Sequence, residues 1–232
     1  MACGGSTLFL PSPSDIARAA LALARDGSLL VHTQASLVVI MSGWALAAVV
    51  AVPLGILMGT LKLVEALVEP VVDFVRYLPV SALIPLLILY IGIGTAEKVA
   101  VIFIGTFFQL VLLVADVSAH VSKDLLDSAY TLGADRGTVF TRVLVPATLP
   151  GVMDNLRITL GWAWTYLVVA ELVSADRGLG YLILDSMRGL FTDRIFVGLF
   201  TIGLLGLASD LGFKWLHRRL LPWSPCSPAR PL

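Results

Sequence analysis

The segment DSAYTLGADRGTVFTRVLVP, from Asp127 to Pro146, lies within residues 119–148, the longest polar connection in an otherwise hydrophobic chain. A turn between two helices needs only about 2–8 residues, so a connection of this length calls for another explanation. Ser122 can cap a first helix, which Gly133 can end in the left-handed conformation. Asp135 can cap a second short helix, which Pro146 is expected to end. The segment therefore predicts a helix–turn–helix with an apolar face, lying along a membrane surface.

The composition of the chain is that of a protein with several membrane spans. Of its 232 residues, 58% are hydrophobic and 14% are charged, whereas soluble domains are about 45–50% apolar and about 25% charged. Sixteen basic residues balance sixteen acidic ones, so nucleic acid is not expected as a partner. Cys3 and Cys226 lie near opposite ends and are expected to be unpaired thiols. No cluster of His, Cys and acidic residues has the spacing of a metal site.

Five segments are long and apolar enough to cross a bilayer, which takes about 20 residues. They are approximately residues 34–60, 64–91, 99–118, 156–173 and 195–216. Each is expected to be a helix, because backbone N–H and C=O groups cannot stay unpaired in lipid. Pro70, Pro79 and Pro85 interrupt the second segment and predict a bend there. The expected fold class is an all-α polytopic membrane protein with five transmembrane helices.

The spans divide the chain into three regions. Residues 1–33 are polar enough to stay in water and contain a short amphipathic surface helix from Asp15 to Arg25. Residues 34–221 form the transmembrane domain, which includes a glycine-rich connection at 174–194 that we expect to be a flexible outer loop. The tail at 222–232 is rich in proline and is expected to be disordered.

The orientation follows from the basic cluster Lys214-Trp215-Leu216-His217-Arg218-Arg219, which directly adjoins the last apolar segment. Positively charged residues next to a span favour the cytoplasmic side. We therefore expect the C-terminus and the connection at 119–148 to be cytoplasmic and, with five spans, residues 1–33 to be periplasmic. No secretory signal precedes the first span, so this span itself is expected to direct the chain to the membrane.

The polar connection resembles the signature of permeases of binding-protein-dependent ABC importers. That signature is Glu-Ala-Ala, three residues, Gly, nine residues and Ile-x-Leu-Pro; this chain has Asp127-Ser128-Ala129, Gly133 and Val143-Leu144-Val145-Pro146 at the same spacing. In the family the loop is a coupling helix that seats in a groove of a separate ATPase subunit. The resemblance implies ATPase-coupling roles for Asp127, Ser128, Ala129, Gly133, Ala134 and Pro146. The departures are Asp127 for Glu and Ser128 for the first Ala; the alternative for the segment is a simple interfacial anchor.

Shorter motifs in the same order resemble the branch of the family that imports sulfonates, taurine, nitrate or bicarbonate. They include Leu10-Pro11-Ser12-Pro13, Arg76-Tyr77-Leu78-Pro79 and Ala170-Glu171-Leu172 followed by Gly178-Leu179-Gly180-Tyr181. Members of this branch usually begin with a further span. We therefore expect either a five-span version with its N-terminus outside or a start that lies upstream of Met1.

The resemblance implies a permease core of a type I ABC importer in the bacterial cytoplasmic (inner) membrane, working by alternating access. The implied partners are a second permease copy, two ATP-binding cassette subunits and a periplasmic or lipid-anchored solute-binding protein. No Gly-x-x-x-x-Gly-Lys-Ser/Thr loop is present, so this subunit is not expected to be an enzyme. We expect no cofactor in this chain, with ATP and magnesium bound by the partner ATPase.

Polar and aromatic residues inside the spans are the candidates for the translocation pathway. They are Arg76, Tyr77, Gln109, Trp164 and Glu171. Arg76 precedes a predicted bend, and its planar guanidinium suits the oxygens of a sulfonate, carboxylate or nitrate. The alternative for Arg76 is an ion pair with Asp73, three residues earlier on the same helix.

The remaining pathway candidates also have structural alternatives. Gln109 can join helices instead of lining the pathway. Trp164 can be a packing aromatic, and Glu171 can pair with Arg177 instead of lining an outer gate.

Two other functions remain open at this point. The same architecture could import an uncharged vitamin precursor such as a pyrimidine or riboflavin, because selectivity resides largely in the binding protein. A secondary transporter that needs no ATPase is a second alternative, but it leaves the connection at 119–148 unexplained.

Overall fold

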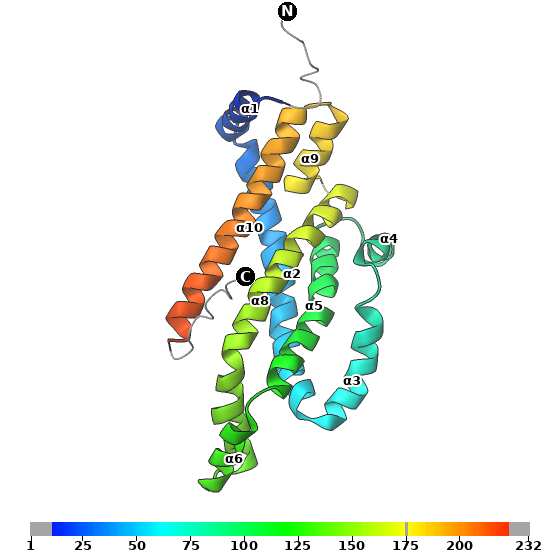
Figure 1. Ribbon diagram of the computed structural model, residues 1–232. Coiled ribbons are helices and arrows are strands. Elements are labelled where there is room, and N and C mark those ends of the chain that lie inside the picture. The colour runs from blue at the N-terminus through cyan, green and yellow to red at the C-terminus, as the bar shows by residue number, and fades with distance from the viewer. Residues whose placement is uncertain (1–10, 175, 223–232) are drawn as a thin grey trace, which may run out of the picture. The chain divides into compact units, whose positions relative to one another are not determined.

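The computed structural model describes residues 11–174 and 176–222 (Figure 1). In chain order the elements are α1 (Pro13–Arg25), α2 (Ser28–Thr60), α3 (Lys62–Val75), α4 (Val80–Ile91), α5 (Thr95–Ala119), α6 (Lys123–Thr131), α7 (Arg136–Thr138), the π-helix η1 (Val139–Leu144), α8 (Val145–Ser174), α9 (Leu179–Arg188) and α10 (Thr192–Leu220). All regular structure in these residues is helical, which confirms the predicted fold class. The proline-rich tail from residue 223 onward lies outside the described residues.

The membrane spans agree with the sequence prediction. Within the described residues α2, α5, the continuous helix over residues 136–173, and α10 are each long and apolar enough to cross a membrane. α3 and α4 meet the same criterion together, as one bent pair that gives the fifth span. The break lies just before Pro79, the N-cap of α4, because proline has no N–H with which to continue a helix. Pro70 and Pro85 lie inside α3 and α4, so only Pro79 breaks the span.

The described residues form two compact units. One comprises residues 11–44, 79–103 and 162–208, and the other comprises residues 45–78, 104–161 and 209–222.

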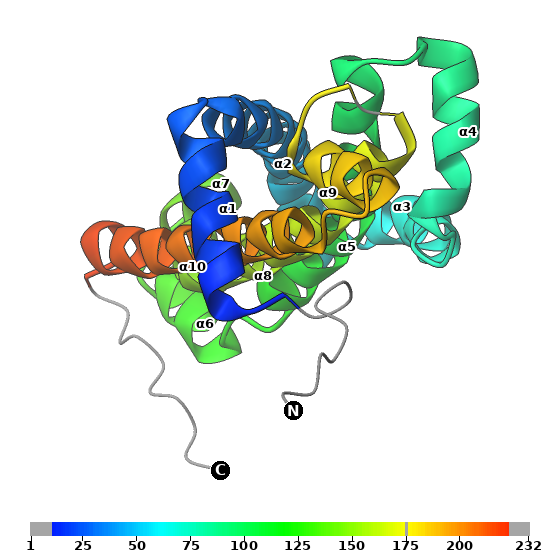
Figure 2. The ribbon, with the colours of Figure 1, turned by 90° about the horizontal axis from the view of Figure 1, so that it is seen from above.

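In the first unit, α1 packs across α9 and α10 (Figure 2). Ala19 and Leu23 of α1 are buried together with Leu182 of α9 and Val197 of α10. Ser12 caps α1 through a reciprocal pair of hydrogen bonds with Asp15. The predicted amphipathic helix is therefore present, but its apolar face is covered by protein.

In the second unit, glycines of α2 allow close contact with α5. A Cβ at Gly55 would lie 2.7 Å from the carbonyl oxygen of Val111, and Gly59 follows at the spacing that lets two helix backbones approach. The side-chain amide of Asn155 in α8 donates to the carbonyl oxygen of Leu113 in α5, at 2.9 Å. Small residues and an interhelical hydrogen bond therefore hold α2, α5 and α8 together in this unit.

Two expectations about the connections are wrong. Pro146 does not end a helix, because the chain is helical without interruption from Arg136 into α8. Directly before Pro146 the helix widens into η1, where the Val145 N–H donates to the carbonyl of Phe140 five residues earlier. The wider turn accommodates a proline ring that would clash with an ordinary α-helical turn. The connection at 174–194 is not wholly a flexible loop, because it contains α9 with its buried Leu182.

Candidate functional site

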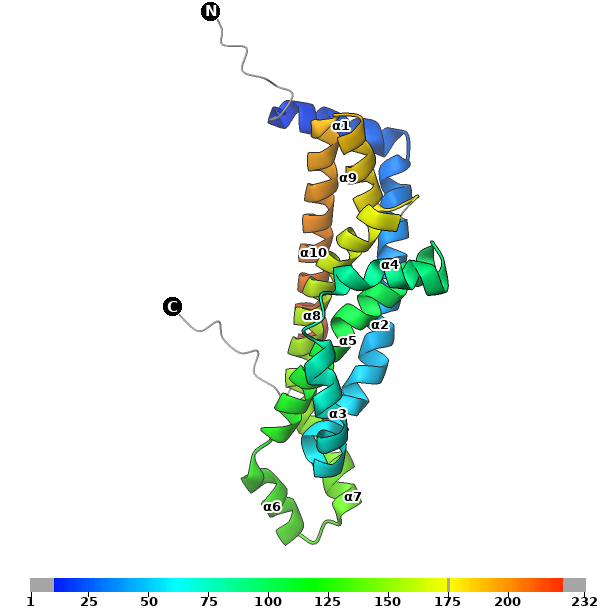
Figure 3. The ribbon, with the colours of Figure 1, turned by 90° about the vertical axis from the view of Figure 1, so that its right-hand side faces the viewer.

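The helix α6 ends in a turn that Gly133 makes possible. Gly133 has a φ of 85°, and its N–H donates to the carbonyl of Tyr130 at 2.9 Å. The N–H of Ala134 donates to the carbonyl of Ala129 at 3.1 Å. These two bonds form the Schellman motif, which satisfies the last carbonyls of a helix and needs a left-handed residue. Figure 3 shows the resulting reversal between α6 and α7.

The second short helix begins at Asp135, as predicted. The Asp135 carboxylate accepts a hydrogen bond from the Gly137 N–H at 3.0 Å and another from the Thr138 hydroxyl. The Thr138 hydroxyl, followed by the backbone N–H groups, holds the pKa of Asp135 below its ordinary value. Ser122 occupies the N-cap position of α6, but its side chain makes no capping hydrogen bond, so that part of the prediction is wrong.

The apolar residues of this segment divide between two directions. Val139 is buried, and Leu126 and Phe140 pack against the core of the second unit. Leu125 and Leu132 face away from it, with Leu132 88% exposed. One side of the segment therefore packs against the second unit, and the other side exposes apolar side chains. This is the arrangement of a helix that docks into a groove.

The predicted coupling residues lie along this segment. Asp127 and Ser128 are exposed on α6, and the Ser128 hydroxyl donates to the carbonyl of Asp124 at 2.6 Å. Ala129 and Ala134 are half-buried, and the longer of the two Schellman hydrogen bonds joins their backbones. Pro146 lies farther along, within the first turn of α8. Their role in contact with an ATPase stays a prediction.

Arg76 lies at the break between α3 and α4. Its Nε is 3.1 Å from a carboxylate oxygen of Asp73, and its terminal nitrogen donates to the Tyr77 hydroxyl at 2.8 Å. The guanidinium also lies over the Tyr77 ring, 4.4 Å from its centroid. The alternative pairing with Asp73 is therefore present. The Arg76 side chain remains 30% exposed, so contact with a solute stays a prediction.

Glu171 is held in a buried hydrogen-bond network of the first unit. Glu171 is 1% exposed, and its carboxylate accepts from the Ser36 hydroxyl and from the Gly180 N–H, both at 2.7 Å. The Ser36 oxygen in turn accepts from the Leu179 N–H at 2.8 Å. Lys98, itself buried, acts electrostatically on the carboxylate. Among the described residues, Ser36 and Gly180 hydrogen-bond to Glu171, and no ion pair joins it to Arg177.

This network fixes the start of α9. The Gly178 N–H, one residue before the helix, donates to Nδ1 of His32 at 3.1 Å. Gly178 has a φ of 128°, and a Cβ at Gly180 would lie 2.7 Å from the Cβ of Glu171. The glycines that suggested flexibility are therefore required for close contact between α8 and α9.

The other two pathway candidates lie within helices. Gln109 is half-buried in α5, and Trp164 is buried in α8. Their place on a pathway stays a prediction.

An ion-pair network in the second unit was not predicted from the sequence. Arg157 of α8 binds Asp210 of α10 through its Nε, and Lys214 lies 2.9 Å from the other oxygen of Asp210. Arg157 and Asp210 both lie inside apolar runs. A charged residue within a span usually has a partner on another helix, so these two charges could have been predicted to pair.

The comparisons with known proteins agree over most of the chain. Residues 51–222 match the family described as binding-protein-dependent transport system inner membrane component. A probable ABC transporter permease of Brucella melitensis is 39% identical over 93% of this chain and 88% of its own length. The taurine transport system permease protein of Escherichia coli is 34% identical over 94% and 81%. A formylaminopyrimidine transport permease protein of Halalkalibacterium halodurans is 32% identical over 94% and 87%.

A solved structure supports the fold. The inward-facing methionine ABC transporter MetNI contains a chain that superposes with a TM-score of 0.71, covering 80% of this chain and 93% of that one. The sequence identity is 20%, so the likeness concerns the fold alone.

Proposed function

The chain belongs to the family of binding-protein-dependent transport system inner membrane components, and from that premise we propose that it carries a small sulfonate, such as taurine, or a related anion across the bacterial inner membrane. It is a membrane-spanning permease of an ABC importer.

The single observation that carries the coupling role is the geometry of α6. The helix ends in the turn at Gly133 and packs against the core of the second unit through Leu126. Leu125 and Leu132 are exposed. An amphipathic helix of this kind binds by laying its apolar side chains into a groove. We propose that the groove belongs to an ATP-binding cassette subunit, one for each of two permease copies. Closure of the ATPase pair would then move α6 and the helices fastened to it.

The turn between α9 and α10 is suited to contact with a solute-binding protein. Leu190 has a φ of 56°, in the left-handed region that is uncommon for a leucine, and is 68% exposed. Phe191 beside it is also exposed. Exposed apolar side chains in a constrained backbone are a feature of recognition sites. We place this turn on the periplasmic side, opposite α6 in the topology.

The proposal of an anionic cargo rests on relatives and on Arg76. Relatives named for taurine and for aliphatic sulfonates are 34% and 32% identical to this chain. A guanidinium that is partly exposed at a break in a span is chemically suited to a sulfonate. The relative named for formylaminopyrimidine favours the second candidate, an uncharged pyrimidine precursor.

A ligand screen on the cognate solute-binding protein separates these cargoes. Taurine, alkanesulfonates, nitrate, bicarbonate and pyrimidines are tested for a shift in its melting temperature, where a ligand at 100 times its Kd stabilises by about 2.7 kcal/mol. We expect a sulfonate to produce the shift and, in proteoliposomes with the full complex, to stimulate ATP hydrolysis. A shift by pyrimidines alone would overturn the anionic cargo and the role of Arg76.

A further inference from the structure

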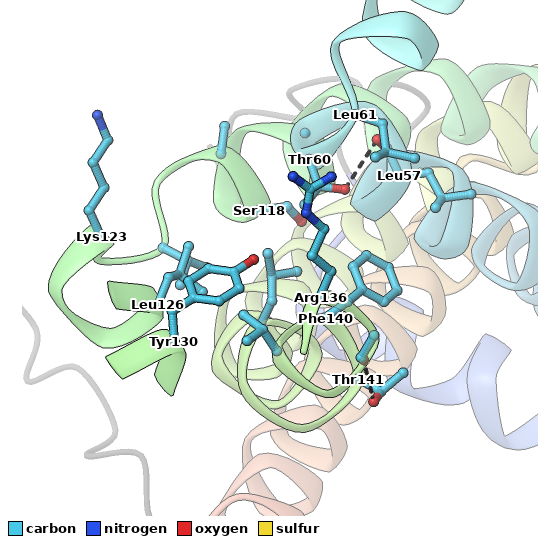
Figure 4. Close-up of a pocket in the computed structure, with 16 residues that line it drawn as sticks. Leu57, Thr60, Leu61, Ser118, Lys123, Leu126, Tyr130, Arg136, Phe140 and Thr141 are labelled. Carbon is cyan, nitrogen blue, oxygen red and sulfur yellow. Dashed lines mark hydrogen bonds between the residues drawn. The ribbon is translucent and has the colours of Figure 1, made fainter. Parts of the chain in front are cut away.

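We call α6, α7 and η1 together, residues 123–144, the coupling segment. A cavity of about 650 Å³ lies between this segment and the ends of two membrane spans (Figure 4). All of it belongs to the second unit. Its walls come from the C-terminal ends of α2 and α5 and from α6, α7 and η1. Most of the lining is apolar, with Leu57, Leu126 and Phe140 among its larger side chains. The volume falls within the range of about 300–1,000 Å³ that is usual for ligand sites.

The charged side chains that line the cavity are both basic. They are Arg136 and Lys123; none of the described lining residues is acidic. In Figure 4 the Arg136 side chain points toward Thr60, at the end of α2, whereas Lys123 points away from the other labelled residues. The ion pairs found among the described residues do not involve Arg136. The Tyr130 hydroxyl is a further donor in the lining.

The position of the cavity restricts what can reach it. α2 and α5 are both long and apolar enough to cross a membrane, and the cavity lies at their C-terminal ends, so we place it near the lipid headgroups. A ligand there must satisfy a guanidinium at one side and cover an apolar wall at the other. A phosphate that accepts two parallel hydrogen bonds suits the first requirement, and an acyl chain suits the second.

We propose that this cavity binds an anionic phospholipid, with its phosphate on Arg136 and the upper part of an acyl chain against Leu126 and Phe140. The lipid would contact α6 and the ends of α2 and α5 at once. The anionic lipid content of the membrane would thereby affect how firmly the coupling segment is held. The proposal rests on the proposed function only in that α2 and α5 cross a membrane.

The test measures lipid retained by the purified full-length permease, with no transport assay. Native mass spectrometry compares phosphatidylglycerol with phosphatidylcholine for the wild type, Arg136→Gln, Arg136→Lys and Arg142→Gln. Arg142 is the matched control, because it is an exposed arginine of η1 that does not line the cavity. We expect Arg136→Gln to weaken phosphatidylglycerol binding about tenfold, since a charge-assisted pair is lost. Arg136→Lys should retain part of the preference, and Arg142→Gln should bind like the wild type.

A second variant tests the apolar part of the site. Ala119→Trp places a large side chain at an exposed lining position and should reduce phosphatidylglycerol binding while Arg136 is still present. Equal binding of both lipids by the wild type, or equal loss in Arg136→Gln and Arg142→Gln, would overturn the proposal. Displacement of phosphatidylglycerol by inorganic phosphate would also overturn it, because the site would then take a free anion. Because the test uses the isolated permease and measures no transport, its failure would leave the proposed function standing.

Discussion

Glu171 and Ser36 are joined by a buried hydrogen bond at the start of α9. The Glu171 carboxylate accepts from Ser36 and Gly180, and the Ser36 oxygen accepts from Leu179. A buried group that loses its partner costs about 1–3 kcal/mol. We therefore expect Ser36→Ala and Glu171→Ala each to lower the melting temperature of the permease in detergent. In the double variant the effects should be non-additive by about 0.5–3 kcal/mol.

The control for this prediction lies on the same helix. The Ser42 hydroxyl is exposed and donates only to carbonyls of α2 itself, at 2.7 Å for Val38. Ser42→Ala should change the stability by less than about 0.5 kcal/mol. Strict additivity of the Ser36 and Glu171 effects would contradict the network.

At the scale of single elements, the end of α6 depends on one backbone conformation. Among the described residues, no atom outside its neighbours lies within 4 Å of a Cβ at Gly133, so the obstacle to substitution there is its φ of 85°. A left-handed L-residue costs about 1–2 kcal/mol, whereas asparagine adopts this conformation more readily. Gly133→Val should therefore reduce co-purification of the ATPase subunit, and Gly133→Asn should largely retain it. Both variants should insert into the membrane; equal co-purification by the two would argue against a role for this turn in coupling.

The start of α7 should be sensitive to acid. Because the pKa of Asp135 is lowered in the folded protein, its capping contribution is fully present above the ordinary value of 3.8 and is lost as the pH falls through the lowered value. Hydrogen exchange at the Gly137 amide, corrected for its intrinsic pH dependence, should accelerate over that acidic range. Asp135→Asn keeps a capping oxygen without a titrating group, so its protection should not change with pH. An equal pH response in the variant would assign the effect to another group.

These elements also show what the sequence can and cannot predict. Apolar length predicts the spans, and local chemistry predicts the turn at Gly133 and the cap at Asp135, because each depends on neighbours a few residues away. The prediction that Pro146 ends a helix is wrong, because the effect of a proline on a helix depends on the width of the preceding turn, which is set by packing. The start of α9 is not predicted, because Ser36 and Glu171 are 135 residues apart and contact each other only in the folded protein. The need for glycine at 178 and 180 follows from that contact.

At the scale of the whole molecule, the distribution of charge supports one orientation in the membrane. His217, Arg218 and Arg219 lie in the last turn of α10, where cations are favourable to the helix dipole. Arg219 also lies over the Trp215 ring, 5.2 Å from its centroid, and tryptophan favours the membrane–water interface. Together these residues are typical of a cytoplasmic helix end.

Cysteine labelling in whole cells tests this orientation. Cys3 and Cys226 are first replaced by serine, and single cysteines are introduced as Leu132→Cys at the end of α6 and Arg177→Cys before α9, both at exposed positions. A reagent that cannot cross the inner membrane should label the Arg177→Cys protein in intact spheroplasts. It should label the Leu132→Cys protein only after the membrane is opened, because ATP is inside the cell and the proposed contact of α6 with an ATPase requires that side. The reverse pattern would place α6 where no ATP is available, and coupling through α6 would then be untenable even if the fold stood unchanged.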